Sequence, residues 1–224
     1  MSFDVVCQTC GAPSSPSVGI CPFCKTPFSS ASGNADPSVE AIEKYYDDGN
    51  LSQALALANS AVTAKPDVLS RLDFVLLFVR ILIETDGPGM KISGLLSTAL
   101  IQNPNHPELL QYVEFMEAKS HLTNRQGDVG EIALQKILRR SPDNALVLFT
   151  LGAHMFWSDG ETLQSIKYLE RCVQIRPNFL RAWGCLGSIY QKIGNVDLAK
   201  RSFQKCLNLE TDPRMRSFFQ KQIV

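Results

Sequence analysis

The feature that most constrains this 224-residue chain is a set of helix-ending prolines that recurs at nearly constant spacing. After residue 37, apolar residues repeat at three- and four-residue intervals, which predicts amphipathic helices. Proline cannot donate a backbone hydrogen bond and clashes with the preceding helical turn, so each proline ends a helix. Four such prolines follow one another at intervals of 38, 38 and 35 residues: Pro66, Pro104, Pro142 and Pro177. A period of this length predicts stacked pairs of helices.

The last full unit shows the pattern inside one period most clearly. Its marked positions are Trp183, Leu186, Gly187, Tyr190, Gly194, Asn195, Ala199, Phe203 and Cys206. This pattern resembles the tetratricopeptide repeat family, with Cys206 in place of the last Ala and Thr211 in place of the terminal Pro. The unit before it has one inserted residue near Asp159-Gly160, and the two middle units are longer and more degenerate.

The resemblance covers residues 37–211 as about five helix pairs. It implies an all-α fold, a right-handed superhelical solenoid with a concave inner face. Asp212-Pro213 begins a further segment, because Pro favours the first turn of a helix. We expect a capping helix over residues 212–224, with Phe218, Phe219 and Ile223 sealing the last repeat.

A separate module is predicted at the N-terminus, where four of the seven cysteines lie within 24 residues. They form two C-x-x-C pairs, which suit a tetrahedral zinc site because each pair presents two thiolates to one metal ion. Four cysteine ligands leave no open coordination position, so the expected Zn²⁺ is structural. A redox dithiol pair and an iron site are the alternatives. The four ligands are Cys7, Cys10, Cys21 and Cys24.

This N-terminal segment resembles the zinc-ribbon family, since Cys21-Pro22-Phe23-Cys24 and Cys7-Gln8-Thr9-Cys10-Gly11 follow its knuckle pattern. Lys25 stands where the family often has Gly. We therefore predict a small zinc ribbon over residues 1–28, joined by a flexible polar linker over residues 29–36. The other three cysteines, Cys172, Cys185 and Cys206, occur singly within helical patterns and are read as small core residues.

The family resemblance also implies where a partner would bind, because such repeats usually hold a peptide or helix on the concave face. The first helix of each pair lines that face. Of the residues expected on that face, those in the middle of the solenoid are mainly apolar and those at its two ends are mainly polar. Each position is equally compatible with an ordinary solvated or packed site. The candidate partner-binding residues are Asp73, Leu77, Arg80, Phe149, Phe156, Arg181, Ser188 and Gln191.

The net charge is zero, but the charges are unevenly distributed. Residues 36–131 hold 14 acidic and 7 basic residues, a balance of −7, whereas residues 164–224 hold 4 acidic and 11 basic residues, a balance of +7. Such asymmetry indicates a site for an acidic protein, a nucleic acid or the acidic end of another solenoid, unless it is simply a solvated surface.

No phosphate-binding loop, nucleophile motif or catalytic metal motif occurs, and the three histidines have no partner at metal-ligand spacing. We therefore predict a protein without enzymatic activity, an adaptor that binds protein partners. No apolar run is long enough for a membrane span, and the first residues lack a signal-peptide pattern, so the expected location is cytoplasmic. Two alternatives remain. One is a nucleic-acid-associated factor using the ribbon and the basic C-terminal end, and the other is a thiol or zinc redox sensor.

Overall fold

The computed structural model describes residues 5–6, 13–14, 38–124, 126–160 and 162–223. Two short strands, β1 (Val5–Val6) and β2 (Pro13–Ser14), pair antiparallel with Val5 opposite Ser14. The four N-terminal cysteines and the linker lie outside the described residues. The predicted zinc ribbon therefore stays a prediction.

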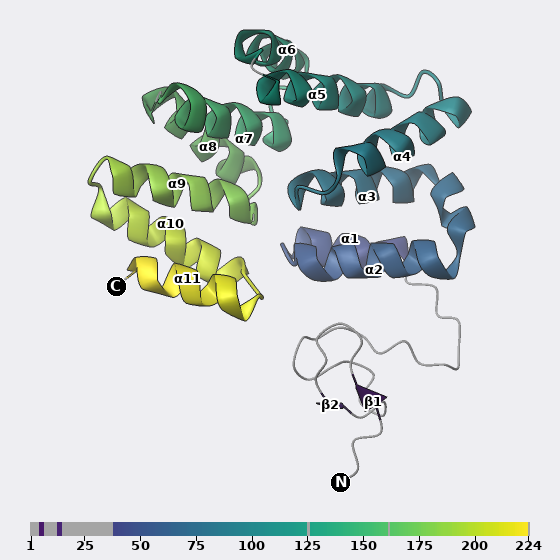
Figure 1. The fold of residues 1–224 in the computed structure, drawn as a ribbon, viewed down its shortest axis with the longest axis horizontal. Helices are drawn as coiled ribbons and strands as arrows, with labels where there is room; N and C mark the ends of the chain where they lie inside the picture. The colour runs from purple at the N-terminus through teal and green to yellow at the C-terminus, as the bar shows by residue number, and fades with distance from the viewer. Residues whose placement is uncertain (1–4, 7–12, 15–37, 125, 161, 224) are drawn as a thin grey trace.

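Helices dominate the rest of the described chain and follow one another as neighbouring antiparallel pairs (Figure 1). The prediction of an all-α repeat fold is confirmed for this part. The pairs are α1 (Val39–Asp47) with α2 (Leu51–Ala64), α3 (Leu72–Glu84) with α4 (Gly89–Gln102), α5 (Pro107–Thr123) with α6 (Gly127–Arg140), α7 (Ala145–His154) with α8 (Thr162–Ile175), and α9 (Leu180–Lys192) with α10 (Val196–Leu209). A short 3₁₀ turn, η2 (Pro66–Ser70), precedes α3, and a single π-helical turn, η3 (Met155–Asp159), extends α7.

The turns inside the first and last pairs share one Gly-Asn device. Gly49 and Gly194 both have a φ of +79°, a left-handed conformation that glycine adopts without a steric penalty. The following residues, Asn50 and Asn195, cap α2 and α10, because each side-chain oxygen accepts a hydrogen bond from the backbone three residues on. The recurrent Gly-Asn dipeptide thus sets the sharp reversal between paired helices.

Helix α11 (Pro213–Ile223) follows the fifth pair as expected. Asp212 accepts hydrogen bonds from the backbone amides of Arg214 and Met215, which caps the helix start. Phe219 is buried with its ring 6.2 Å from that of Phe203, but Phe218 is 49% exposed. The expectation that Phe218 seals the last repeat is therefore wrong, because α11 turns only one face toward α10.

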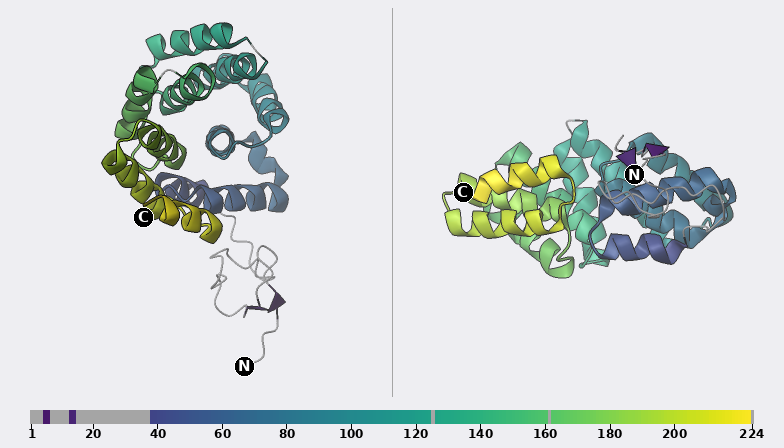
Figure 2. Two further views of the ribbon diagram at one scale, coloured as in Figure 1. Left: turned by 60° about the vertical axis from the view of Figure 1, so that its left-hand side comes forward. Right: turned by 90° about the horizontal axis from the view of Figure 1, so that it is seen from below.

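Helix α3 occupies the middle of the molecule. Nine of its thirteen residues are buried, and they lie on all sides of the helix rather than on one stripe. A helix that is apolar all round is a buried helix. Figure 2 shows α3 nearly end-on, with the other helix pairs arranged in a ring around it. The superhelix is wound so tightly that the inner helix of its second pair forms the centre of the core.

The ring closes where the first pair meets the last two pairs (Figures 1 and 2). The side-chain amide of Asn178, between α8 and α9, donates to the backbone carbonyl of Asp47 at the end of α1. A Cβ atom at Gly49 would lie 3.0 Å from the Cβ of Asn178 and 3.3 Å from a methyl carbon of Leu209. Segments about 130 residues apart in sequence are thus in direct contact, and we call this junction the seam.

Candidate functional site

The seam is held by a buried polar cluster that we call the clasp, made of Tyr46, Glu84 and Arg176. Tyr46 donates from its hydroxyl to Glu84 Oε1 at 2.6 Å, and Arg176 donates to both of these side chains. The guanidinium carbon of Arg176 lies 4.1 Å from the centre of the Tyr46 ring. The clasp joins α1, the end of α3 and the end of α8, so it ties the first two pairs to the fourth.

Burial is the main physical influence on the clasp. Glu84 is 1% exposed, and this desolvation raises the pKa of its carboxyl group, while Arg176 and Tyr46 act in the opposite direction. Burial likewise raises the pKa of the Tyr46 hydroxyl, so this group remains a proton donor. Among the described residues, Glu84 Oε2 and Arg176 Nη2 have no hydrogen-bond partner. The clasp is therefore a buried ion pair with a bridging tyrosine, and Glu84 also lines the neighbouring pocket.

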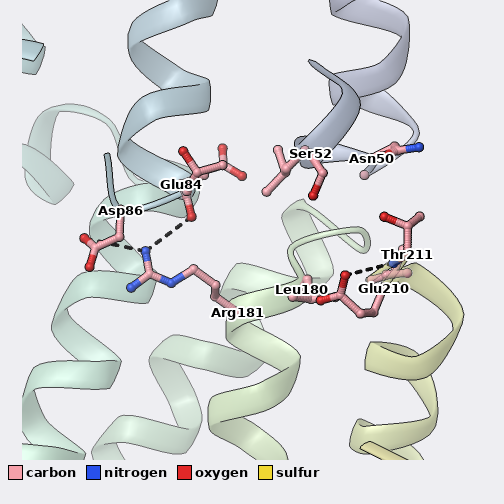
Figure 3. A pocket seen from close by; sticks show the side chains of 12 residues that line it. Asn50, Ser52, Glu84, Asp86, Leu180, Arg181, Glu210 and Thr211 are labelled. Atoms are coloured by element: carbon pink, nitrogen blue, oxygen red, sulfur yellow. Dashed lines mark hydrogen bonds and ion pairs between the residues drawn. The ribbon is translucent and has the colours of Figure 1, made fainter. Parts of the chain in front are cut away.

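A pocket of about 340 Å³ opens along the seam beside the clasp (Figure 3). Its walls come from the start of α2, the end of α3, the start of α9 and the segment after α10. Arg181 crosses one side of it, donating to the backbone carbonyl of Glu84 at 3.3 Å and lying 4.0 Å from Asp86. Asp86 is itself paired with Lys119, which lowers the pKa of its carboxyl group. The opposite charges in this region largely compensate one another.

A second surface runs along α7 and α9, and we call it the cation–aromatic strip: Phe149, Phe156 and Trp157 with Arg181, Ser188 and Lys192. On α9, Arg181, Ser188 and Lys192 lie on one face, because seven and four residues correspond to nearly whole turns. Arg181 lies over the ring of Phe149, 4.9 Å from its centre, and Lys192 lies over the ring of Phe156, also at 4.9 Å. The two contacts near opposite ends of α9 show that α7 and α9 run alongside each other in the same direction.

Trp157 stands at one end of the cation–aromatic strip. Its ring lies edge-on to that of Phe156, with ring centres 4.7 Å apart, yet it is 67% exposed. Burial raises the pKa of the Cys185 thiol on α9, and the Trp157 indole acts on that pKa in the opposite direction. The strip therefore combines buried aromatic rings, two cations and one exposed tryptophan on neighbouring helices.

The structure separates the eight candidate residues into four on the strip, one against α11 and three on α3. Phe149, Phe156, Arg181 and Ser188 lie together on the cation–aromatic strip. Gln191, on the same helix, instead bonds Gln222 in α11. Phe149 and Phe156 are only 8% and 5% exposed, so in this conformation the cations above them form the outer surface.

The remaining three candidates belong to α3. Leu77 is buried in the core. Arg80 donates to the Tyr112 hydroxyl at 2.8 Å and pairs with Glu108, so it joins α3 to α5. Asp73 pairs with Arg71 and accepts from the backbone amide of Phe74 at the start of its own helix. Leu77 and Arg80 thus serve the packing of α3, whereas Asp73 is exposed at the start of the helix.

Residues of the clasp, and Trp157 and Lys192 of the strip, were not among the sequence candidates. Lys192 lies one turn beyond Ser188, so extending the same helical face would have found it. Trp157 had a weaker signal, the inserted residue near Asp159-Gly160, which the structure absorbs as the π-turn η3. Single π-turns of this kind are frequent at functional sites. The clasp had no sequence signal, because its members belong to three unrelated repeat positions.

No group of three or more His, Cys, Asp or Glu side chains in the described parts of the chain is arranged to hold a metal ion. Within the same residues, no helix combines the length and apolar character needed to cross a bilayer. Cys172 and Cys206 are buried and Cys185 is half-buried, in agreement with their interpretation as packing residues.

Comparison with known proteins adds the following. A family model described as "Tetratricopeptide repeat" matches residues 146–179 and 180–213. A protein of Pseudomonas aeruginosa described as "TPR repeat-containing protein PA0015" is 31% identical over 74 residues, which cover 33% of this chain and 70% of that protein.

Among solved structures, TTC0263, described as a thermophilic TPR protein of Thermus thermophilus, has a TM-score of 0.50 at 14% identity, covering 83% of this chain and 96% of that one. YrrB, described as a TPR protein with an unusual peptide-binding site, has a TM-score of 0.44 at 14% identity, covering 84% of this chain and 92% of that one. At these identities the likeness to the Thermus protein is one of fold.

Proposed function

This chain belongs to the tetratricopeptide repeat family, and from this premise we propose that it is a non-catalytic scaffold that holds a segment of a partner protein. Stacked helix pairs of this kind present extended surfaces built from many repeats, and binding is the use to which such surfaces are put. The partner segment is a peptide or a helix.

The observation that carries the proposal is the cation–aromatic strip. Aromatic residues and Arg are the side chains that dominate binding energy at protein interfaces, and Trp157 is 67% exposed next to them. The strip lies on the first helices of the last two full pairs, which is where the family resemblance places the ligand. We therefore assign the partner segment to Phe149, Phe156, Trp157, Arg181, Ser188 and Lys192.

Site-specific photo-crosslinking of the full chain in native lysate tests this proposal. A photoreactive amino acid replaces Ser188 in the strip or, as the control, Lys205, which is exposed on the second helix of the last pair. The same protein should be captured from position 188, at low and high salt, and not from position 205. Equal capture from both positions would contradict the assignment.

The same experiment separates the alternatives. A nucleic-acid-associated factor would yield nucleic acid whose recovery falls steeply as salt rises, because such binding depends on counterion release. Recovery of that kind from position 205, with no protein from position 188, would replace the scaffold proposal.

We further propose that Cys7, Cys10, Cys21 and Cys24 bind one structural Zn²⁺ ion. The support is the spacing of the two C-x-x-C pairs, and a segment this small gains its folding free energy from the metal. The cytoplasm suits this proposal, because a reducing compartment keeps the four thiols available as ligands.

Metal analysis of the purified full chain tests the zinc proposal. We expect one zinc per chain, and none after Cys21→Ser and Cys24→Ser. Retention of the metal in that double variant would contradict it. Loss of zinc under mild peroxide, together with altered partner binding, would favour the redox-sensor alternative instead.

A further inference from the structure

The charge on helices α7 and α9 is one-sided, although the turn η3, which carries Trp157, ends at the acidic Asp159. Helices α7 and α9 contain no Asp or Glu between Ala145 and His154 or between Leu180 and Lys192. They contribute the cations Arg181 and Lys192. The acidic residues that the structure places against Arg181 are Glu84, whose carboxylate is engaged in the clasp, and Asp86, which is 4.0 Å from Arg181 and paired with Lys119.

Both cations lie over the rings of buried phenylalanines. Each is 4.9 Å from the centre of a phenylalanine ring, within the range of an attractive cation–π contact. Their stems cover rings that would otherwise face outward, as long cationic side chains commonly do. Lys192 is exposed, and neither α7 nor α9 supplies an acidic partner for it. Arg181 keeps 37% of its side chain exposed while it contacts Asp86 at 4.0 Å.

The exposed aromatic ring is next to these cations. Trp157 packs edge-on against Phe156, the ring that Lys192 covers. An apolar side chain from a partner gains area by packing on the indole, while an acidic side chain beside it pairs with Lys192. Clusters of this type, an aromatic anchor with flanking charges, are typical of peptide-binding surfaces.

We propose that the strip recognises an acidic partner segment in which Asp or Glu flanks a bulky apolar residue. The apolar residue packs on Trp157 at the edge of Phe156, and the acidic residues pair with Lys192 and Arg181. This inference rests on the proposed function and specifies the chemistry of the partner. Charge complementarity with a cation-only pair of helices is the argument for it.

The test uses the full chain and three sets of short synthetic peptides that carry a fluorescent label. All share one Leu-Phe pair, and they differ in the flanking residues: Asp and Glu, Ser and Gln, or Lys. Fluorescence anisotropy gives the dissociation constants at low and moderate salt. The acidic set should bind most tightly, and its affinity should fall as salt increases.

Two substitutions and a matched control locate the effect. Trp157→Ala should weaken the acidic set more than tenfold, as removal of an aromatic anchor does at a binding hot spot. Lys192→Gln should weaken it about threefold, the size expected for one exposed ion pair. Lys205→Gln removes the same charge from the outer helix α10 and should leave the affinity unchanged.

The outcomes separate this inference from the proposed function. If neutral or basic peptides bind best and Trp157→Ala weakens them, the strip binds peptides but the acidic specificity is wrong. If Lys205→Gln weakens binding as much as Lys192→Gln, the attraction is that of the overall charge, which also overturns the inference. If none of the three sets binds, both the specificity and the assignment of the strip are wrong.

Discussion

At the scale of single residues, the clasp shows how a buried charge is tolerated. Glu84 is almost completely buried, which raises the pKa of its carboxyl group, and Arg176 and Tyr46 oppose this effect. Taking one ion out of water costs several kcal/mol, so a buried ion pair adds little net stability. Its main effect is to fix the relative positions of the helices that carry it. Removing one partner is much more costly than removing both.

We therefore predict that Arg176→Ala lowers the free energy of unfolding by about 3 kcal/mol, near the low end for broken buried pairs because Arg176 keeps 17% of its side chain exposed. The double variant Glu84→Leu/Arg176→Met should lose less than the single variant. Urea unfolding of both variants and of Glu84→Leu measures this coupling. Strictly additive losses would show that the two side chains do not interact.

The three single cysteines give a second test at this scale. Burial raises the pKa of the Cys206 thiol to about 12, well above the ordinary value for a thiol. Burial also raises the pKa of Cys172 and of Cys185, but Cys185 is half-buried and more accessible. Since the thiolate is the reactive form, these cysteines should react slowly at neutral pH.

Alkylation of the folded chain at pH 8, followed by peptide mass spectrometry, should leave Cys206 and Cys172 unmodified while Cys185 reacts slowly. The rate at Cys206 should rise with pH toward pH 12, because the deprotonated fraction rises, and all three should react fully in urea. Rapid modification of Cys206 at pH 8 without urea would contradict its burial.

At the scale of elements, the helix pairs depend on glycines that allow two backbones to approach. A Cβ atom at Gly152 would lie 2.8 Å from Leu169 Cγ and 3.1 Å from the Ser165 carbonyl, and one at Gly187 would lie 2.6 Å from the Phe203 ring. Both glycines follow a leucine in the repeat pattern, Leu151-Gly152 and Leu186-Gly187, and a small residue there allows two helices to cross closely. The sequence also predicts the start of α11, whereas the turn conformation at the Gly-Asn dipeptides comes from the structure.

Other elements were not predictable from local pattern. The π-turn η3 depends on how α7 accommodates one extra residue, and the exposure of Phe218 depends on the orientation of α11 on α10. Both are decided by tertiary packing, which acts beyond the few residues that a periodicity measures.

Alanine at two helical glycines tests the packing argument. Gly152→Ala should lower the free energy of unfolding by roughly 1–3 kcal/mol, because Leu169 and the α8 backbone must move. Gly94→Ala is the control, since no atom lies within 4 Å of its added Cβ. It should raise the stability by about 0.5–1 kcal/mol, as helix propensity predicts. Thermal unfolding followed by circular dichroism measures both, and equal signs for the two would refute the close crossing.

At the scale of the whole molecule, the uneven distribution of charge along the sequence contributes to the closure of the ring. The acidic first half and the basic last part meet within one chain, through Glu84 with Arg176 and Asp86 with Arg181. The charge asymmetry indicated, as one alternative, contact with the acidic end of another solenoid, and here acidic and basic parts of one solenoid make such a contact. Side-chain pairs whose members lie 92 or more residues apart cannot be predicted from the local sequence. Whether they meet depends on the pitch of the superhelix, to which every repeat between them contributes.

The seam predicts different effects of one substitution at two similar turns. Gly49 and Gly194 share a φ of +79°, so alanine at either position costs roughly 1–2 kcal/mol of backbone strain. Only at Gly49 does the new Cβ also press on Asn178 and Leu209, whereas no atom lies within 4 Å at Gly194. Gly49→Ala should therefore destabilise the chain more than Gly194→Ala in urea unfolding. Equal losses would indicate that the two ends are not in contact.

The most direct test of the closed ring is a distance across the seam in solution. Ser52 and Thr211 are exposed residues that line the same pocket from the first pair and from the segment after the last pair. Spin labels carried by a non-natural amino acid at these two positions leave the native cysteines untouched, and pulsed dipolar spectroscopy then gives the distribution of distances between the labels. A single narrow distribution at short distance is the result that the closed superhelix predicts. A long or broad distribution, as for an open solenoid whose ends do not meet, would contradict it.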